Sequence, residues 1–322
     1  DSPTATLTDR ALIALLLAFA AWIASAREAD FDFWYNMAAG REILSAGRIV
    51  FTDSFTHTAA GHRYPPAEWL FQVMIYGLHR AFGDAGARLA LIDRRDPEAA
   101  ATALRAKGVE ARSYTADAMD RNSLAAVAEA IGKDLGRPDI LLNAVGGNQP
   151  DATTSAEQKF FDLPLAGLER VVALNLFAGA ILPSQVFGCA MAGHGGSIIN
   201  ITSMAADRPL TRIAGYAAAK AGVSNFTRWL AVHLAQEYDK ALRVNAIAPG
   251  FFSTAQNKYL LWTSDGTLTD RGKAIVAHTP QGRFGEPADL AGACVWLASD
   301  ASRFVTGTVV PIDGGFSAFS GV

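Results

Sequence analysis

A tyrosine and a lysine four residues apart, with a serine thirteen residues before the tyrosine, have types and spacing suited to acid/base chemistry. Tyr216 and Lys220 lie one turn apart on one face of a predicted helix, so the ammonium can act on the phenol. A free tyrosine titrates at about pH 10, and a nearby cation brings its pKa toward neutrality. Ser203 follows a predicted buried strand, and Asn175 lies upstream. Together these residues predict proton transfer at a carbonyl, as accompanies hydride transfer.

A Tyr-x-x-x-Lys pair alone also fits a half-buried tyrosine beside a solvated lysine, so the elements around it matter. Short apolar runs alternate with longer segments of helical periodicity, which predicts a doubly wound, Rossmann-like α/β sheet of parallel strands. The predicted strands are 88–92, 111–116, 139–144, 197–202, 243–248 and 308–312, and two amphipathic helices are predicted over 124–135 and 223–238. The carboxyl ends of such strands share one crevice, which Asp93, Asp117, Asn143, Ser203 and Pro249 would line.

These motifs in this order resemble the short-chain dehydrogenase/reductase family over residues 87–322. The resemblance includes Leu-Asn-Ala-Val-Gly-Gly at 142–147, Ala-Ile-Ala-Pro-Gly at 246–250 and Asp-Gly-Gly at 313–315. Residues 143–148, 198–220 and 309–316 are similar to the branch of D-mannonate oxidoreductases, or fructuronate reductases. The resemblance implies an NAD-dependent oxidoreductase of carbohydrate metabolism that forms a homotetramer and acts on a sugar acid.

The family also implies a role for each matching residue. Tyr216 would give a proton to the substrate oxygen, Ser203 would hold that oxygen, and Lys220 would tune the phenol and bind the ribose. Asn175 would anchor a water that links Lys220 to solvent. Further cofactor contacts are implied for Asp117 at the adenine, for Asn143, Ala144 and Gly146 along the nicotinamide, for Thr254 at the carboxamide, and for Pro249 and Gly250.

The cofactor preference depends on the end of the first predicted strand. Asp93 can accept hydrogen bonds from the adenosine ribose and repel a 2′-phosphate, which favours NAD over NADP. Arg94 and Arg95 follow directly and could hold a phosphate, so NADP stays open.

A sugar acid needs a partner for its carboxylate. Arg208 and Arg212, just before Tyr216, are the candidates for a charge-assisted pair, although at least one could be a solvated surface arginine. Asn148, with Thr153 and Thr154, could bind substrate hydroxyls by resemblance. Residues 251–268 are predicted to form a lid over the substrate.

The N-terminal region departs from the family. A member would carry a Thr-Gly-x-x-x-Gly-x-Gly loop for the pyrophosphate before residue 87, and no such cluster is present in 1–86. Residues 11–26 form an apolar run that is marginal for a membrane helix. Residues 30–44 and 68–70 resemble the start of bacterial multi-spanning membrane proteins of the C-type glycosyltransferase kind. A fusion with its join near 84–87 is therefore expected, in which 48–52 could replace the missing first strand and 65–82 the following helix.

Composition narrows the function classes. A net charge of −3 argues against nucleic-acid binding, and the histidines and the two cysteines, Cys189 and Cys294, show neither metal-ligand spacing nor a disulfide framework. The enzyme is expected in the cytoplasm, with a membrane tether through 11–26 as an option. The alternatives are a fusion that folds without binding cofactor, and a membrane-associated protein without enzymatic activity.

Overall fold

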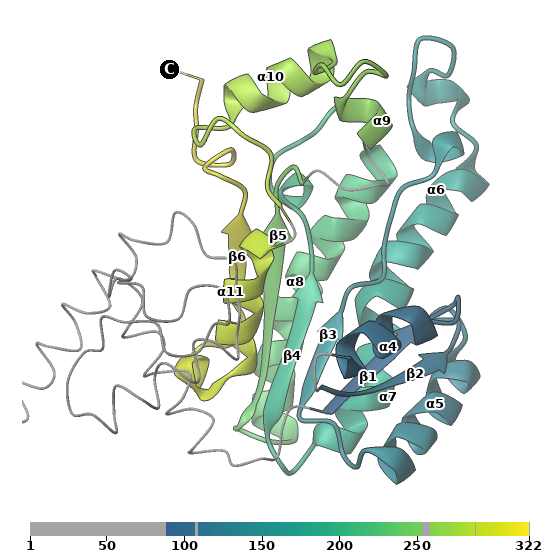
Figure 1. The fold of residues 1–322 in the computed structure, drawn as a ribbon, viewed down its shortest axis with the longest axis vertical. Helices are drawn as coiled ribbons and strands as arrows, with labels where there is room; N and C mark the ends of the chain where they lie inside the picture. Colours follow the sequence, from purple (N-terminus) through teal and green to yellow (C-terminus); the bar gives the residue numbers. More distant parts are fainter. Residues whose placement is uncertain (1–87, 107–108, 253–257, 287, 322) are drawn as a thin grey trace, which may run out of the picture. The chain divides into compact units, whose positions relative to one another are not determined.

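The computed structural model describes residues 88–106, 109–252, 258–286 and 288–321 (Figure 1). The chain divides into two compact units, Asp1–Arg88 and Leu89–Val322. The expectations for 11–26, 48–52 and 65–82, and the role of Thr254, lie outside the described residues.

All six predicted strands are strands, with limits shifted by at most one residue. They are β1 (Arg88–Asp93), β2 (Glu110–Thr115), β3 (Ile140–Asn143), β4 (Gly196–Ile201), β5 (Leu242–Pro249) and β6 (Val309–Ile312). The last four form a parallel sheet in the order β3-β4-β5-β6, with Asn143 beside Asn200 and Ile201 beside Ile247. β1 and β2 form a separate two-stranded sheet. The predicted α/β class with parallel strands is confirmed.

Helices connect the strands and cover both faces of the larger sheet. They are α4 (Glu98–Arg105), α5 (Arg121–Asp134), α6 (Leu165–Val172), the π-helical segment η4 (Ala173–Ile181), α7 (Leu182–Met191), α8 (Ala214–Glu237), α9 (Lys258–Leu261), α10 (Asp270–His278) and α11 (Ala288–Ala298). The helix predicted over 223–238 is continuous with the segment that carries Tyr216 and Lys220. Three consecutive alanines between those two residues favour this continuity, because alanine is the strongest helix former.

Alternation along the strands separates two cores. Ile198 packs with Val244 and with Leu230 of α8, whereas its neighbour Ile199 packs with Ile247 and with the α11 side. Successive strand residues point to opposite faces, so both faces need a helical cover. Figure 1 shows both covering helices, α8 and α11, packed on the larger sheet.

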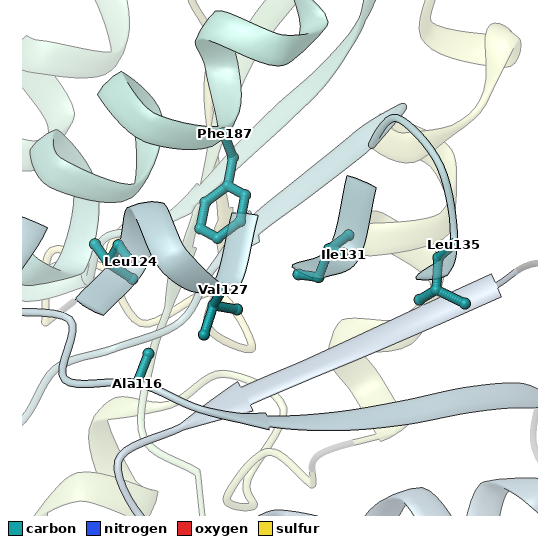
Figure 2. Packing of buried hydrophobic residues seen from close by; sticks show 6 residues of the cluster. All are labelled: Ala116, Leu124, Val127, Ile131, Leu135 and Phe187. Atoms are coloured by element: carbon teal, nitrogen blue, oxygen red, sulfur yellow. The ribbon is translucent and has the colours of Figure 1, made fainter. Parts of the chain in front are cut away.

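A third cluster joins the smaller sheet to the rest of the unit. Figure 2 shows Ala116 after β2, four residues of α5 and the segment after it, and Phe187 of α7; the cluster comprises Ala116, Leu124, Val127, Ile131, Leu135 and Phe187. Leu141 of β3 and Ile92 of β1 pack against it. The two sheets are therefore held by a shared core, although within the described residues no hydrogen-bonded pairing joins β1 to β3.

The β3 strand shows the effect of that break. Ile140 and Leu142 are 51% and 48% exposed, although both are apolar residues of a parallel strand. Strands of parallel sheets are normally covered on both faces. From the sequence, unpaired neighbours of the missing first strand are expected only if residues 48–52 do not replace it, and those residues lie outside the described part.

One helical run in the described part is long and apolar enough to cross a membrane. It is Leu165–Met191, with a mean hydropathy of 1.6, and it comprises α6, η4 and α7. These elements pack against α8, α5 and β3. We therefore interpret the run as a core helix of the α/β unit.

Candidate active site

The carboxyl end of β4 and the first turns of α8 position the residues predicted to be catalytic. Ser203 begins the short helix η5 (Met204–Ala206), and its hydroxyl accepts a hydrogen bond from the Ala205 N–H at 3.1 Å. Tyr216 and Lys220 lie on consecutive turns of α8, with the Lys220 Nζ 5.7 Å from the centre of the Tyr216 ring. The same ammonium donates to the carbonyl oxygen of Ile201 at 2.8 Å.

Burial controls the proton affinities of this pair. It raises the pKa of the Tyr216 phenol, and a hydrogen-bond interaction with Ser203 opposes that rise. Burial also lowers the pKa of the Lys220 ammonium to about 8, since this side chain is almost fully enclosed. Removal from water disfavours both the phenolate and the ammonium in the cofactor-free chain. The tuning of the Tyr216 pKa by Lys220 stays a prediction.

Asn175 is placed by the π-helical segment η4 and is completely buried. Its amide nitrogen donates to the carbonyl oxygens of Gly147 (2.6 Å) and Val171 (2.8 Å), and its Oδ1 accepts from the Gly147 N–H at 3.1 Å. Such π-helical turns occur often at functional sites because they re-aim a side chain. Here the side chain fastens the loop that follows β3. The predicted water link to Lys220 stays a prediction.

The loop after β3 comes very close to two of the residues predicted to be catalytic, Asn175 and Lys220. A methyl group added at Gly146 would lie 2.7 Å from the Asn175 Oδ1 and 3.1 Å from the Lys220 Nζ. A side chain at this position would displace one of those groups, so the chemistry requires a glycine here. The bare backbone also leaves room for a ligand over Lys220.

This loop borders a cavity of about 1640 Å³. The cavity passes the carboxyl ends of β1, β2 and β3, where Asp93, Asp117 and Ala144 line it, and extends to Arg271 of α10. The switch from one strand to the next at such an edge is where open α/β sheets bind ligands. Ser203, Tyr216 and Lys220 do not line the cavity themselves and adjoin it at Gly146.

Five of the predicted cofactor residues line the cavity, namely Asp93, Asp117, Asn143, Ala144 and Gly146, and Arg94 and Arg95 do so as well. The Asp93 and Asp117 carboxylates are exposed, and each accepts one backbone N–H, from Arg95 at 2.8 Å and from Met119 at 2.9 Å.

The side chain of Asn143 is buried and engaged with the protein itself. The Asn143 side chain donates to Asn200 Oδ1 at 2.9 Å and to Ser184 Oγ at 3.1 Å, which ties β3 to β4 and α7. Pro249 and Gly250 do not line the cavity, and a methyl group at Gly250 would lie 2.6 Å from Asp313 Cβ. The cofactor contacts of Asn143, Pro249 and Gly250 stay predictions.

A nicotinamide dinucleotide fits the described residues at both of its ends. An exposed carboxylate at the end of β1 suits an adenosine ribose, and the uncovered backbone beside Lys220 suits the nicotinamide ribose. The glycine-rich turn that would bind the pyrophosphate is missing from the sequence before residue 87. The described residues thus match the two nucleoside ends of the cofactor and not its pyrophosphate.

The predicted substrate residues are not all brought together. Arg212 and Asn148 line the cavity, and Asn148 donates to Thr153 Oγ1 at 2.8 Å. Arg208 lies outside it and donates to the Ser317 carbonyl oxygen at 2.6 Å. Arg271 also lines the cavity, and it is not predictable from the sequence because no site motif surrounds it.

Comparisons with known proteins agree with this geometry. A family model described as enoyl-(acyl carrier protein) reductase matches residues 76–317. With these motifs and this fold, the chain belongs to the short-chain dehydrogenase/reductase family, whose members are NAD(P)-dependent oxidoreductases.

Two relatives are 44% identical to this chain. One is an uncharacterized oxidoreductase of Bacillus subtilis named UxuB, matched over 78% of this chain and 93% of its own length. The other is a crystal structure from Haemophilus influenza, provisionally named D-mannonate oxidoreductase and holding NAD. It has a TM-score of 0.68 and is matched over 73% of this chain and 88% of its own. A 2-dehydro-3-deoxy-D-gluconate 5-dehydrogenase of Dickeya dadantii is 32% identical over 75% of this chain and 90% of its own.

Proposed function

We propose that the protein transfers hydride between NAD and the carbonyl or secondary alcohol of a sugar acid, such as D-fructuronate and D-mannonate. The observation that carries this proposal is the placement of Lys220 beside Gly146 at the border of the large cavity, with the Tyr216 ring 5.7 Å from the Lys220 Nζ. The name of the NAD-bound Haemophilus relative supports the substrate class.

In the reductive direction Tyr216 donates its proton to the carbonyl oxygen of the substrate. Ser203, which interacts with Tyr216, holds the same oxygen and orients it toward the phenol. Lys220 stabilises the phenolate that forms and holds the nicotinamide ribose. Reduced cofactor supplies the hydride. Desolvation keeps the phenol protonated before the reaction, which suits a general acid.

NAD is preferred over NADP in this proposal because of Asp93. Its exposed carboxylate lines the cavity at the end of β1 and would repel a 2′-phosphate. Arg94 and Arg95 line the same cavity and are the groups through which NADP would bind. The cofactor preference therefore depends on which of these charges faces the ribose.

The test is NADH oxidation by the purified full-length chain with D-fructuronate, compared with the Tyr216→Phe variant. We expect wild-type turnover, and a loss of at least about 100-fold in kcat for Tyr216→Phe, since the variant removes the general acid. NADH affinity of the variant should stay nearly unchanged. Equal turnover by both proteins would reject the catalytic assignment.

A second candidate is a protein that folds but does not turn over. The sequence favours it through one observation, the missing glycine-rich turn for the pyrophosphate. Cofactor binding by the full chain discriminates between the two candidates. Purification without detergent addresses the remaining alternative, a membrane-associated protein that is not an enzyme.

A further inference from the structure

Two arginines from separate segments line the same cavity. Arg212 lies in the turn before α8, and Arg271 is the second residue of α10. Arg271 is half-buried, whereas Arg212 is exposed to the cavity and solvent. The positive charge of Arg212 lowers the pKa of the Arg271 guanidinium, after burial as the first cause. The two guanidinium groups are therefore close enough to repel each other.

Neither arginine has a carboxylate partner within the described residues. The ion pairs found there use other arginines and lysines, and no hydrogen bond of either guanidinium to the described part is recorded. Three acidic residues line the same cavity, Asp93, Asp117 and Glu169, and none of them forms an ion pair with either arginine in the part that the structure describes. Two like charges without a counter-charge are unfavourable, and an anion placed between them removes the repulsion.

The backbone holds Arg212 in a costly conformation. Its φ is +77°, the only positive value for a non-glycine residue in the part that the structure describes. The Thr154 N–H donates to the Arg212 carbonyl oxygen at 3.0 Å and helps to fix this conformation. Strained non-glycine residues persist where their side chain is needed in one place, which is common at ligand sites.

The surroundings of the two arginines are suited to a polyhydroxylated ligand. Hydroxyl and amide side chains line the same cavity, namely Asn148, Thr153, Ser155 and Gln158. Such groups hydrogen-bond to hydroxyls, whereas guanidinium groups bind carboxylates with two parallel hydrogen bonds. These side chains therefore suit a ligand that carries one anionic group and several hydroxyl groups.

We propose that Arg212 and Arg271 together bind the carboxylate of the substrate, and that Arg271 sets the preference for sugar acids over neutral sugars. This inference rests on the proposed function and specifies its substrate site. Arg208 has no part in it, because its guanidinium is engaged with the Ser317 carbonyl outside the cavity.

The experiment measures binding and turnover with matched acidic and neutral ligands. The ligands are D-mannonate and D-mannitol, which differ in that D-mannonate has a carboxylate where D-mannitol has a hydroxymethyl group. Each is titrated by calorimetry into the wild type and into the variants Arg271→Met, Arg271→Lys and Lys273→Met. Lys273 lies on α10, is exposed and does not line the cavity, so its variant controls for the loss of one positive charge on the same helix. NADH-dependent reduction of D-fructuronate and D-fructose is measured in parallel.

We expect Arg271→Met to weaken D-mannonate binding and raise the KM for D-fructuronate by about tenfold to 100-fold, the effect of a lost charge-assisted hydrogen bond. The kcat and the reaction with D-fructose should stay within about twofold. Arg271→Lys should recover part of the loss, and Lys273→Met should behave as the wild type.

An unchanged KM and D-mannonate affinity in Arg271→Met would overturn the proposal, as would equal losses for acid and neutral ligands. Absence of D-mannonate binding by the wild type would overturn it too. If D-mannonate binds through Arg271 but no turnover occurs, the arginine site stands and the proposed function fails. If turnover occurs but is indifferent to Arg271, the function stands and the arginine site fails.

Discussion

Tyr216 and Lys220 are both buried before any ligand binds, and burial destabilises the charged form of each group. The Lys220 ammonium, with a pKa of about 8, stays mostly protonated at neutral pH but has lost much of its proton affinity. A small change in the surrounding charge can therefore shift the proton on the pair. This suits a site that must donate a proton in one direction and accept it in the other.

Lys220 should also make folding stability depend on pH. Its pKa is about 8 in the fold against 10.5 as the ordinary value, so between these limits the unfolded chain binds more protons. The free energy of unfolding attributable to Lys220 should rise with pH across that window, by up to about 3 kcal/mol. Urea unfolding of the wild type and Lys220→Met at pH 7.5 and 10 measures it. A stability difference that does not move toward the wild type as pH rises would contradict the burial argument.

At this scale the sequence predicts residues that lie near one another along the chain. Tyr216 and Lys220 share a helix face, and the structure confirms that they adjoin. Arg271 could not be predicted, because its proximity to Arg212 depends on how α10 folds back toward the turn before α8. The direction of the Tyr216 pKa was also inaccessible, since burial is a property of the fold.

At the scale of elements, η4 and the loop after β3 are fitted to each other. Asn175 holds Gly147 through both of its backbone groups, and Gly179, one turn further, lies against the Val145 carbonyl. A methyl group at Gly179 would lie 2.6 Å from that oxygen. The helix and the loop thus approach as closely as backbones can, and the loop position depends on this contact.

Gly179→Ala should destabilise the protein and reduce activity. The added methyl would push the loop away from η4, at a cost of about 1–3 kcal/mol for an overpacked site. Gly132→Ala on α5 is the matched control, because a methyl there meets nothing within 4 Å. It should stabilise the protein by about 0.5–1 kcal/mol, since alanine is the better helix residue. Urea unfolding and kcat measure both variants, and equal behaviour of the two would contradict the role given to the contact.

The strands were predictable because each is a short apolar run with its own turn signals, as in 197–202 and 243–248. The π-helical geometry of η4 was not, since 165–191 reads as an ordinary apolar helix. The wider turn of this π-helix accompanies its contacts with the loop after β3, and such contacts leave no local pattern in the sequence. The same limit applies to the lid predicted over 251–268, of which the structure describes only part, including α9.

At the scale of the whole molecule, the two sheets share a core but no hydrogen-bonded strand within the described residues. The predicted cofactor residues are distributed across this division, with Asp93 on the small sheet and Gly146 beyond the large one. Binding a dinucleotide therefore requires that the shared core, which includes residues of α5 and α7, hold the two sheets in a fixed relative position. The predicted homotetramer and the cytoplasmic location stay predictions.

We expect NADH to bind the full-length chain at micromolar concentrations, because the groups for both ribose ends are in place. Titration followed by nicotinamide fluorescence measures it, with Asp93→Ala as the comparison. This variant should weaken NADH binding by about tenfold, the effect of a lost hydrogen bond to a carboxylate. Absence of binding at millimolar NADH would favour the candidate that folds without turning over.

The left-handed backbone of Arg212 has a consequence for laboratory evolution. Glycine adopts this conformation without strain, so a screen for heat resistance alone should favour glycine at this position. A screen for growth on a sugar acid should retain arginine instead. Selection for thermal stability and selection for activity on a sugar acid should therefore favour different residues at position 212.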